Sequence, residues 1–416
     1  NCHLHRPSDI VSVSPNVIAF QKMKNHFILK RLCSLIYIGG AGNCWYEPGE
    51  VPEDNTLLYR IYSTFLLSVY GFMTILEILG AAMGDFPAQE KSDCVAFAIS
   101  HTIVMIKLFS VISNKELIRS LNRNMVNVCE KYEEVALSLE KYKMIRINVI
   151  AYFVTVYGSV VGFIFDGSHF VTVVTYYPEY EDNSLYATIF RLLMTLTLCL
   201  MMLSMIICVD GFTMVHLLIF KYKFITLRHY FEKIRDEFHK ENERGNRIVA
   251  AQKLTEGLIE GLVMHEKLLR LARDIDSCFG IVMTMQIGIS SGTAVSLLLQ
   301  LVLSDQLTLV ASMKIVLFVI ALFFLLALFL CNAGEITYQA SLLSDSIFYC
   351  GWHASQPLPP PHRNLRRLVL QAVCQVQKPL IMKAFKMLEL TYATFLLVVR
   401  STYSVFALFY ARNKDF

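Results

Sequence analysis

Charged residues are scarce in this chain, and the short motifs of common enzymes are missing from it. Asp, Glu, Lys and Arg make up 17% of the 416 residues, while 55% are hydrophobic and the mean hydropathy is +0.48. Soluble globular proteins are usually about 45–50% apolar, so we expect a bilayer to cover the excess. No Cys-x-x-Cys pair, phosphate-binding loop or nucleophile elbow occurs. The sequence therefore predicts neither an enzyme nor a cofactor.

Seven apolar stretches are long enough to cross a bilayer, whose core takes about 20 residues of helix. These predicted spans are Leu57–Met83, Asp93–Ser113, Ile145–Phe165, Thr188–Cys208, Ser277–Leu303, Leu309–Cys331 and Leu388–Tyr410. The fold class that we predict is an all-α membrane protein with seven transmembrane helices.

Basic residues are almost absent from every second connection. The N-terminal segment and the second, fourth and sixth loops hold 29 of the 38 Lys and Arg residues, whereas the other loops and the tail hold three. Loops rich in Lys and Arg stay in the cytosol. We therefore predict a cytoplasmic N-terminus and an extracellular C-terminus, the reverse of a G-protein-coupled receptor. This topology accounts for the net charge of +4, and we expect no nucleic acid partner.

Extracellular cysteines and a signal peptide are lacking as well. Of the eleven cysteines, only Cys94 is expected near the outer surface, so we predict no extracellular disulfide. No apolar signal-peptide core precedes Leu57, which makes the first span the expected insertion signal. The chain starts with Asn1, and we expect its natural start to lie upstream.

Long inner connections predict a cytoplasmic helical anchor bundle. Segment Arg247–Asp276 carries leucines at helical spacing and is expected to extend the fifth span. Such a stripe needs a covered face, which Gly211–Lys240, Ala340–Cys350 and Leu365–Leu380 are expected to supply, with Gln356–Pro361 as a linker. The predicted organisation is 1–56 cytoplasmic, 57–210 spans one to four on the ligand side, 211–276 cytoplasmic extensions, 277–331 spans five and six, 332–387 anchor segment, and 388–416 pore helix and tail.

A few ionisable residues fall inside the predicted spans. Lys107, Arg191 and Lys314 lie within about two turns of a membrane face, where long side chains are expected to reach the surface. Arg400 lies near the middle of the last span, where an arginine faces protein or water. An inter-helix pair and a place beside an aqueous pathway are both open. Glu77 is expected to pair internally.

Histidines give no clear metal or catalytic site. His101, on the outer half of the second span, is either a satisfied buried histidine or a ligand contact. Cys2, His3 and His5 form a pattern too weak to predict a metal site, so we expect no metal and no catalytic residue.

Residues at the inner ends of the last three spans resemble the insect odorant receptor family. The resemblance rests on Gln377–Leu380, Phe395 and Arg400–Leu408 in the last span, and on Ser344 and Tyr349–Trp352 after the sixth. It extends from about Arg31 and is strongest after residue 255. Further matching positions are Lys107, Asp210, His265, Leu271-Ala272, Gln286 and Ser290-Ser291.

The resemblance implies a tetrameric, odorant-gated, non-selective cation channel in the cell membrane, in contact with lipid, on the dendrites of olfactory neurons. Gustatory receptors differ, since Val398-Val399 replaces the Gln-Phe that follows their Thr-Tyr. The obligate co-receptor differs too, because its inner loop after the fourth span is much longer. The chain thus resembles a ligand-tuning subunit that forms a heterotetramer with co-receptor subunits. A gustatory-type receptor channel and a membrane transporter remain alternatives, although we find no inverted repeats.

Bulky residues recur on one face of the last span. Val399, Tyr403, Phe406 and Tyr410 share this face at helical spacing, and it is expected to line a pore or to pack internally. A hydrophobic constriction gates by dewetting, and the resemblance places it at Phe406. Arg400, about 100° away from Val399, is expected at an interface.

The odorant pocket is expected on the outer halves of spans two, three, four and six, where aromatic and flexible apolar residues gather. The predicted ligand residues are Phe97, His101, Met105, Tyr157, Val160, Val161, Ile164, Phe190, Met194, Thr197, Val316 and Ile320. They suit a small volatile. Burying roughly 300 Å² of the odorant's surface gains about 7 kcal/mol of free energy before costs. The free-energy costs of binding reduce this gain, so we expect micromolar affinity.

Overall fold

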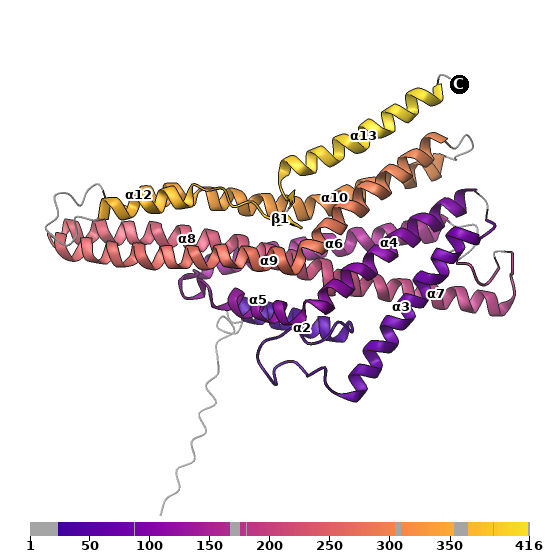
Figure 1. The fold of residues 1–416 in the computed structure, drawn as a ribbon, viewed down its shortest axis with the longest axis horizontal. Coiled ribbons are helices and arrows are strands. Elements are labelled where there is room, and N and C mark those ends of the chain that lie inside the picture. Colours follow the sequence, from indigo (N-terminus) through magenta and orange to yellow (C-terminus); the bar gives the residue numbers. More distant parts are fainter. Residues whose placement is uncertain are drawn as a thin grey trace, which may run out of the picture.

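The predicted spans fall on long helices of the computed structural model, although the last one begins before its helix. The structure describes residues 24–86, 88–166, 175–179, 181–303, 309–352, 365–385 and 387–414 (Figure 1). Six described helical stretches are long and apolar enough to cross a membrane by length and composition. The third span, Ile145–Phe165, lies in α6, whose side chains from residue 160 onward are outside the described part. The seven helices are α3 (Leu57–Met83), α4 (Ala88–Ser113), α6 (Val135–Asp166), α7 (Leu185–Ser204), α9 (Arg247–Leu303), α10 (Leu309–Ser341) and α13 (Tyr392–Lys414).

The fourth span continues without a break into the predicted cytoplasmic segment. Helix α7 begins where the Ser184 hydroxyl accepts a hydrogen bond from the Ala187 N–H, an N-cap arrangement. One π-helical stretch, η2 (Met205–Asp210), joins it to α8 (Gly211–Glu243). Together these elements form one helical stretch of 59 residues. Such π segments are rare and frequently mark functional sites.

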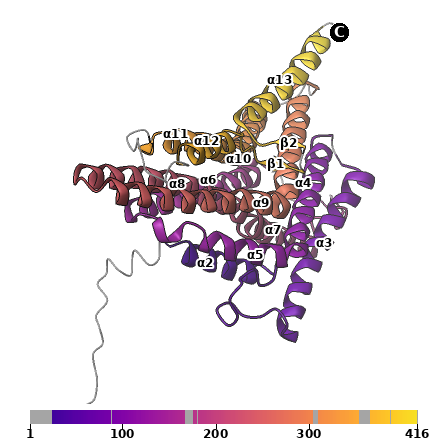
Figure 2. The same cartoon turned by 60° about the vertical axis from the view of Figure 1, so that its left-hand side comes forward.

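The predicted helical bundle is present. Helix α8 lies along the extended part of α9, and α11 (Leu343–Phe348) and α12 (Leu365–Val376) pack beside them (Figures 1 and 2). Leu254, Leu258 and Leu268 of α9 are buried, which confirms that the leucine stripe forms a covered face of this helix. At Gly261 an added Cβ would lie 2.4 Å from the Phe231 ring, so glycine permits the close approach of α8 and α9. The proline-rich Gln356–Pro361 lies outside the described residues.

The start of the last span was predicted wrongly. Residues after α12 form a short antiparallel hairpin, β1 (Lys383–Ala384) and β2 (Leu388–Glu389), and α13 begins only at Tyr392. The Thr391 hydroxyl accepts a hydrogen bond from the Thr394 N–H and so caps the helix start. Apolar residues run through Leu388 and Leu390, so hydropathy alone does not mark this boundary.

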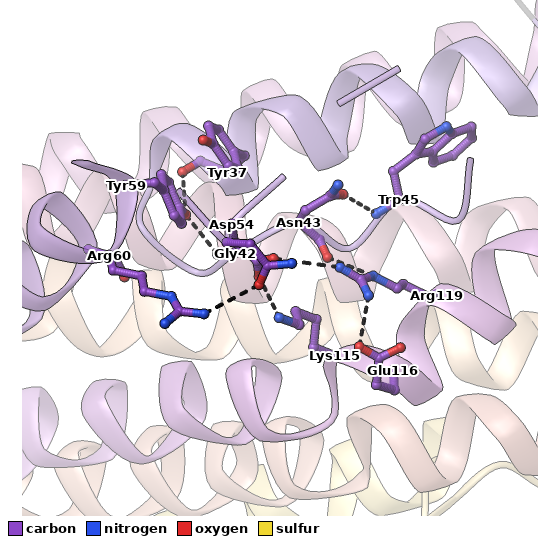
Figure 3. Close-up of polar contacts among 12 residues, drawn as sticks. Tyr37, Gly42, Asn43, Trp45, Asp54, Tyr59, Arg60, Lys115, Glu116 and Arg119 are labelled. Carbon is purple, nitrogen blue, oxygen red and sulfur yellow. Dashed lines mark hydrogen bonds and ion pairs between the residues drawn. The ribbon is translucent and has the colours of Figure 1, made fainter. Parts of the chain in front are cut away.

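The N-terminal segment folds against the helices. Helix α2 (Asn25–Ile38) and the following loop lie beside α5 (Lys115–Asn127), which precedes the short η1 (Glu130–Tyr132) (Figure 2). Figure 3 shows how the loop is held: Asp54 pairs with Lys115, and Arg119 donates to the Asn43 carbonyl at 2.9 Å. Tyr59 donates to the Tyr37 carbonyl at 2.8 Å. Residues 39–56 are therefore a structured strap between α2 and α3.

Candidate functional site

A mostly apolar cavity of about 120 Å³ lies among five of the long helical stretches. Helix α4 supplies one wall, α9 and α10 supply another, and α6 with the α7–η2 stretch closes the rest. The lining residues are Ala96, Phe97, Ser100, His101, Val104, Lys107, Tyr152, Val156, Ser159, Leu198, Met202, Met205, Gln286, Ile289, Thr293, Leu297, Phe318, Ala321, Leu322 and Leu325. A lining that is mostly apolar with a few convergent polar groups has the chemical character of a small-molecule site.

One end of the cavity is a polar cluster centred on Lys107. Its Nζ lies 3.1 Å from Asp210 Oδ1 and 2.5 Å from Gln286 Oε1. The Tyr152 hydroxyl donates to Asp210 Oδ2 at 2.5 Å. The four side chains come from α4, η2, α9 and α6, so one buried ion pair with its hydrogen bonds ties four helical elements together. Isolated charges here would be costly, whereas paired ones are tolerated.

This cluster corrects the expectation that Lys107 reaches the membrane surface. The side chain is 1% exposed because its partners lie in the interior on distant segments. The prediction was wrong because it considered only how close Lys107 lies to the membrane face. Lys107, Asp210 and Gln286 were nevertheless all among the positions that resemble the odorant receptor family. Arg191 does reach outward and donates to the Glu179 carbonyl at 2.7 Å. Lys314 has a side chain outside the described part of the chain.

A second buried polar pair joins α3 to α4 beside the cavity. His101 Nδ1 lies 2.6 Å from Glu77 Oε2, and neither residue is measurably exposed. Glu77 therefore pairs internally, as predicted. Within the described part of the chain, His101 Nε2 and Glu77 Oε1 are buried and lack a hydrogen-bond partner.

The predicted ligand residues divide into three groups. Phe97 and His101 line the cavity, and their rings lie nearly parallel with centroids 5.8 Å apart. Val160, Val161 and Ile164 have side chains outside the described residues. The others lie on helices around the cavity without being among its lining residues, and the set as a whole stays a prediction; this third group is Met105, Tyr157, Phe190, Met194, Thr197, Val316 and Ile320.

Sequence reasoning missed the whole contribution of α9 to this cavity. Gln286, Ile289, Thr293 and Leu297 recur three or four residues apart and so share one helix face. This spacing is visible in the sequence. It did not stand out because apolar residues occupy every face of a transmembrane helix.

Helix α13 differs from the other long helices in its exposure. Only 6% of its apolar window is buried inside the chain, against 33–44% for the other candidate spans, and both views show it standing away from the rest (Figures 1 and 2). The predicted face stays together: the Phe406 ring stacks on Tyr410 at 6.0 Å and lies 6.4 Å from Tyr403, with Val399 half-buried a turn further in.

Polar side chains are also uncovered on α13. Arg400, Ser401 and Ser404 are exposed, whereas neighbouring Thr402 is 2% exposed. Arg400 is open to an inter-helix pair or to an aqueous path. In either case, the group or the water that contacts its side chain comes from outside α13.

The described residues offer one group that could hold a metal ion, namely His26, Glu47 and Glu50 near the start of α2. Glu50 already accepts hydrogen bonds or ion pairs from Trp45 and Lys30, so we assign no metal there. Cys2, His3 and His5 lie outside the described residues.

Comparison with known proteins identifies relatives of both sequence and fold. The family model described as 7tm Odorant receptor matches residues 91–403. Two structures of the insect olfactory receptor OR5 from Machilis hrabei are similar, one with a TM-score of 0.72 and one in complex with eugenol with 0.69. Each is 13% identical, and the match covers 94% of this chain and 98% of that one. No curated protein sequence matches. The structural likeness shows the fold, an all-α protein with seven transmembrane helices.

Proposed function

The chain belongs to the 7tm odorant receptor family, a family of receptors and not of enzymes, and from this membership we propose that it is the ligand-binding subunit of an odorant-gated, non-selective cation channel. It is a multi-pass membrane protein, and the proposed pore is shared with co-receptor subunits in a heterotetramer. The proposed place of action is the dendritic membrane of olfactory neurons.

The observation that carries this proposal is the uncovered polar side of α13. Arg400, Ser401 and Ser404 are exposed near the middle of a helix that its own chain barely covers. An arginine at mid-membrane does not face lipid; it faces protein or water. Other subunits or an aqueous path must therefore complete the surroundings of α13. Both are supplied if α13 lines a pore at the centre of an oligomer, with Val399, Tyr403, Phe406 and Tyr410 as its constricting face.

The cavity supplies the site for the ligand, which we propose to be a small volatile. Its walls include α9, and α13 packs against both α9 and α10. A ligand that binds the cavity more tightly when these helices take their open arrangement shifts the channel toward opening, and only such a difference in affinity can do so. The short hairpin before α13 is also attached to α9, through the Lys383 N–H and Asp276 Oδ1 at 3.3 Å.

Co-expression with a co-receptor subunit tests the proposal. The chain alone is expected to give little odorant current, and the pair is expected to give a robust one across a panel of volatiles. Deleting residues 365–380, which include α12, should prevent assembly, because this helix is part of the bundle proposed to hold subunits together. Absence of current from the pair at normal surface expression would overturn the channel proposal, and normal pull-down of the deleted chain would remove α12 from the interface.

A further inference from the structure

We propose that His101 is a hydrogen-bond donor to the odorant and that it selects volatiles carrying a carbonyl oxygen, such as ketones, aldehydes and esters. This inference rests on the proposed function and adds to it the chemical class of the ligand. Its basis is an unpaired, fully buried nitrogen at the wall of the cavity.

The geometry directs this nitrogen away from Glu77. His101 lines the cavity, whereas Glu77, which holds its Nδ1 at 2.6 Å, does not. The two ring nitrogens of an imidazole point in widely different directions, so Nε2 faces the opposite side. Among the buried side-chain atoms without a partner in the described part of the chain, His101 Nε2 is the one that belongs to a cavity-lining residue.

The proton on this nitrogen follows from charge balance. A carboxylate enclosed in the membrane interior needs a compensating positive charge, and Lys107 is already paired with Asp210. The Glu77–His101 pair is therefore neutral overall. Either the imidazolium faces the carboxylate, or the proton has moved to Glu77 Oε2 and the neutral ring accepts it at Nδ1. In both arrangements Nε2 carries a hydrogen and can only donate. A proton on Glu77 Oε1 instead would be a buried donor without an acceptor, which is less favourable.

A buried donor without an acceptor is unfavourable, so an occupant that supplies an acceptor oxygen gains more than one that does not. The polar cluster at Lys107 does not compete for this oxygen. There the Lys107 ammonium already has Asp210 and Gln286 as acceptors. Apart from the hydroxyl groups of Ser100, Ser159 and Thr293, the remaining wall is apolar and suits the hydrocarbon part of the ligand, with Val104, Val156 and Leu198 as neighbours. Because His101 is wholly buried, binding in this way requires that side chains at this wall move to let the oxygen reach Nε2.

Matched probes test the inference in the full chain expressed with a co-receptor. Each probe pair is a small ketone and the alkene in which a methylene group replaces its oxygen. In the wild type the ketones should have activation midpoints about tenfold lower than their alkenes. This comparison needs no variant and so does not depend on mutant folding.

Two substitutions then locate the donor. In His101→Asn the amide nitrogen replaces Nδ1 and keeps the Glu77 contact, but nothing replaces Nε2, so the difference between ketone and alkene midpoints should disappear. In His101→Gln the amide nitrogen replaces Nε2, so the advantage should remain. Thr102→Val serves as the control, since the Thr102 hydroxyl donates to the Ala98 carbonyl and does not line the cavity.

The outcomes separate this inference from the proposed function. Equal midpoints for ketones and alkenes in the wild type overturn it, as does an equal effect of His101→Asn on both. Currents to other volatiles with no response to any ketone overturn the ligand class and leave the channel standing. If no volatile produces a current at normal surface expression, the proposed function fails and the inference fails with it.

Discussion

Lys107 and Asp210 form a buried ion pair across 103 positions of sequence, with Nζ and Oδ1 3.1 Å apart. Lys107 stands on α4, and Asp210 ends the π-helical stretch between α7 and α8. The pair therefore attaches the end of this π-helical stretch to α4 beside the cavity.

Removing one member of this pair should destabilise the protein more than removing both. Lys107→Met leaves the Asp210 carboxylate buried and uncompensated, which costs about 3–5 kcal/mol. We expect a lower melting temperature of the detergent-solubilised protein and less protein at the surface. The double variant Lys107→Met with Asp210→Leu should recover part of the loss, because no charge is left buried. A double variant as unstable as the sum of the singles would contradict this account.

Residues that line the cavity should set odorant sensitivity. Leu198→Ala removes a lining side chain and should shift dose–response midpoints by roughly 5- to 150-fold, which corresponds to about 1–3 kcal/mol, without changing ion selectivity. Met194 and Phe190, predicted from the sequence, lie further out on α7. If Met194→Ala and Phe190→Ala move the midpoints and Leu198→Ala does not, the ligand binds nearer the outer surface than the cavity.

Phe406 should act at the gate. Its ring packs between Tyr403 and Tyr410 on the uncovered face of α13, and a polar replacement would lower the barrier to wetting. Phe406→Ser is therefore expected to raise current without odorant or to change permeation. Leu397→Ile, at an exposed position elsewhere on the helix, is the control. Unchanged basal current and selectivity in Phe406→Ser at normal surface expression would show that this ring does not close the pore.

Lys223 in the helical bundle should make a positive contribution to the pH dependence of stability in the alkaline range, whereas buried thiols such as Cys129, whose pKa burial raises from 9.0 to about 11, contribute with the opposite sign. Burial lowers the pKa of Lys223 from 10.5 to about 8, and its ammonium donates to the Val128 carbonyl. Below about pH 8 Lys223 is charged in the folded state, and the free-energy cost of burying its ammonium group is fully present. Between about pH 8 and 10.5 this lysine binds more protons in the unfolded chain, so its own contribution to the free energy of unfolding increases with pH.

Lys223→Met should remove this dependence and raise stability near neutral pH by up to about 3 kcal/mol. The measurement is the melting temperature of the purified assembly over this pH range. Lys233→Met, at an exposed position on the same helix, should keep the wild-type slope. The same slope in Lys223→Met would show that another group causes it.

Epitope tags should report a cytosolic N-terminus and an extracellular C-terminus, because 29 of the 38 basic residues lie in the segments assigned to the cytosol. Antibody staining of intact cells should detect the C-terminal tag, and the N-terminal tag only after permeabilisation. Staining of the N-terminal tag on intact cells would invert the topology and remove the pore proposed for α13.

The helices could be predicted because their signals are local. Apolar runs locate the spans, and leucines at helical spacing locate the extension of α9, since each depends only on neighbouring residues. The start of α13 was wrong because the apolar run extends back over the hairpin at Leu388, and only Thr391 marks the true beginning.

The site was harder to predict because its contacts join distant segments. Nothing near Lys107 in the sequence indicates that Asp210 and Gln286 will surround it. The pairing of Glu77 with His101 could be anticipated in part, since a buried carboxylate needs a partner, but the orientation of the imidazole could not. Lining residues on α9 share a face, yet hydropathy does not say which face of a membrane helix turns inward.

The helical stretch from Leu185 to Glu243 limits how such receptors can be recombined. It is 59 residues long, or about 90 Å at 1.5 Å per residue, and it carries cavity residues at one end and bundle residues at the other. No loop divides this helical stretch between the end that lines the cavity and the end that packs in the bundle. A chimera that exchanges loops would therefore leave tuning unchanged, and one that exchanges the sensing half must be joined inside a helix, in register with Asp210.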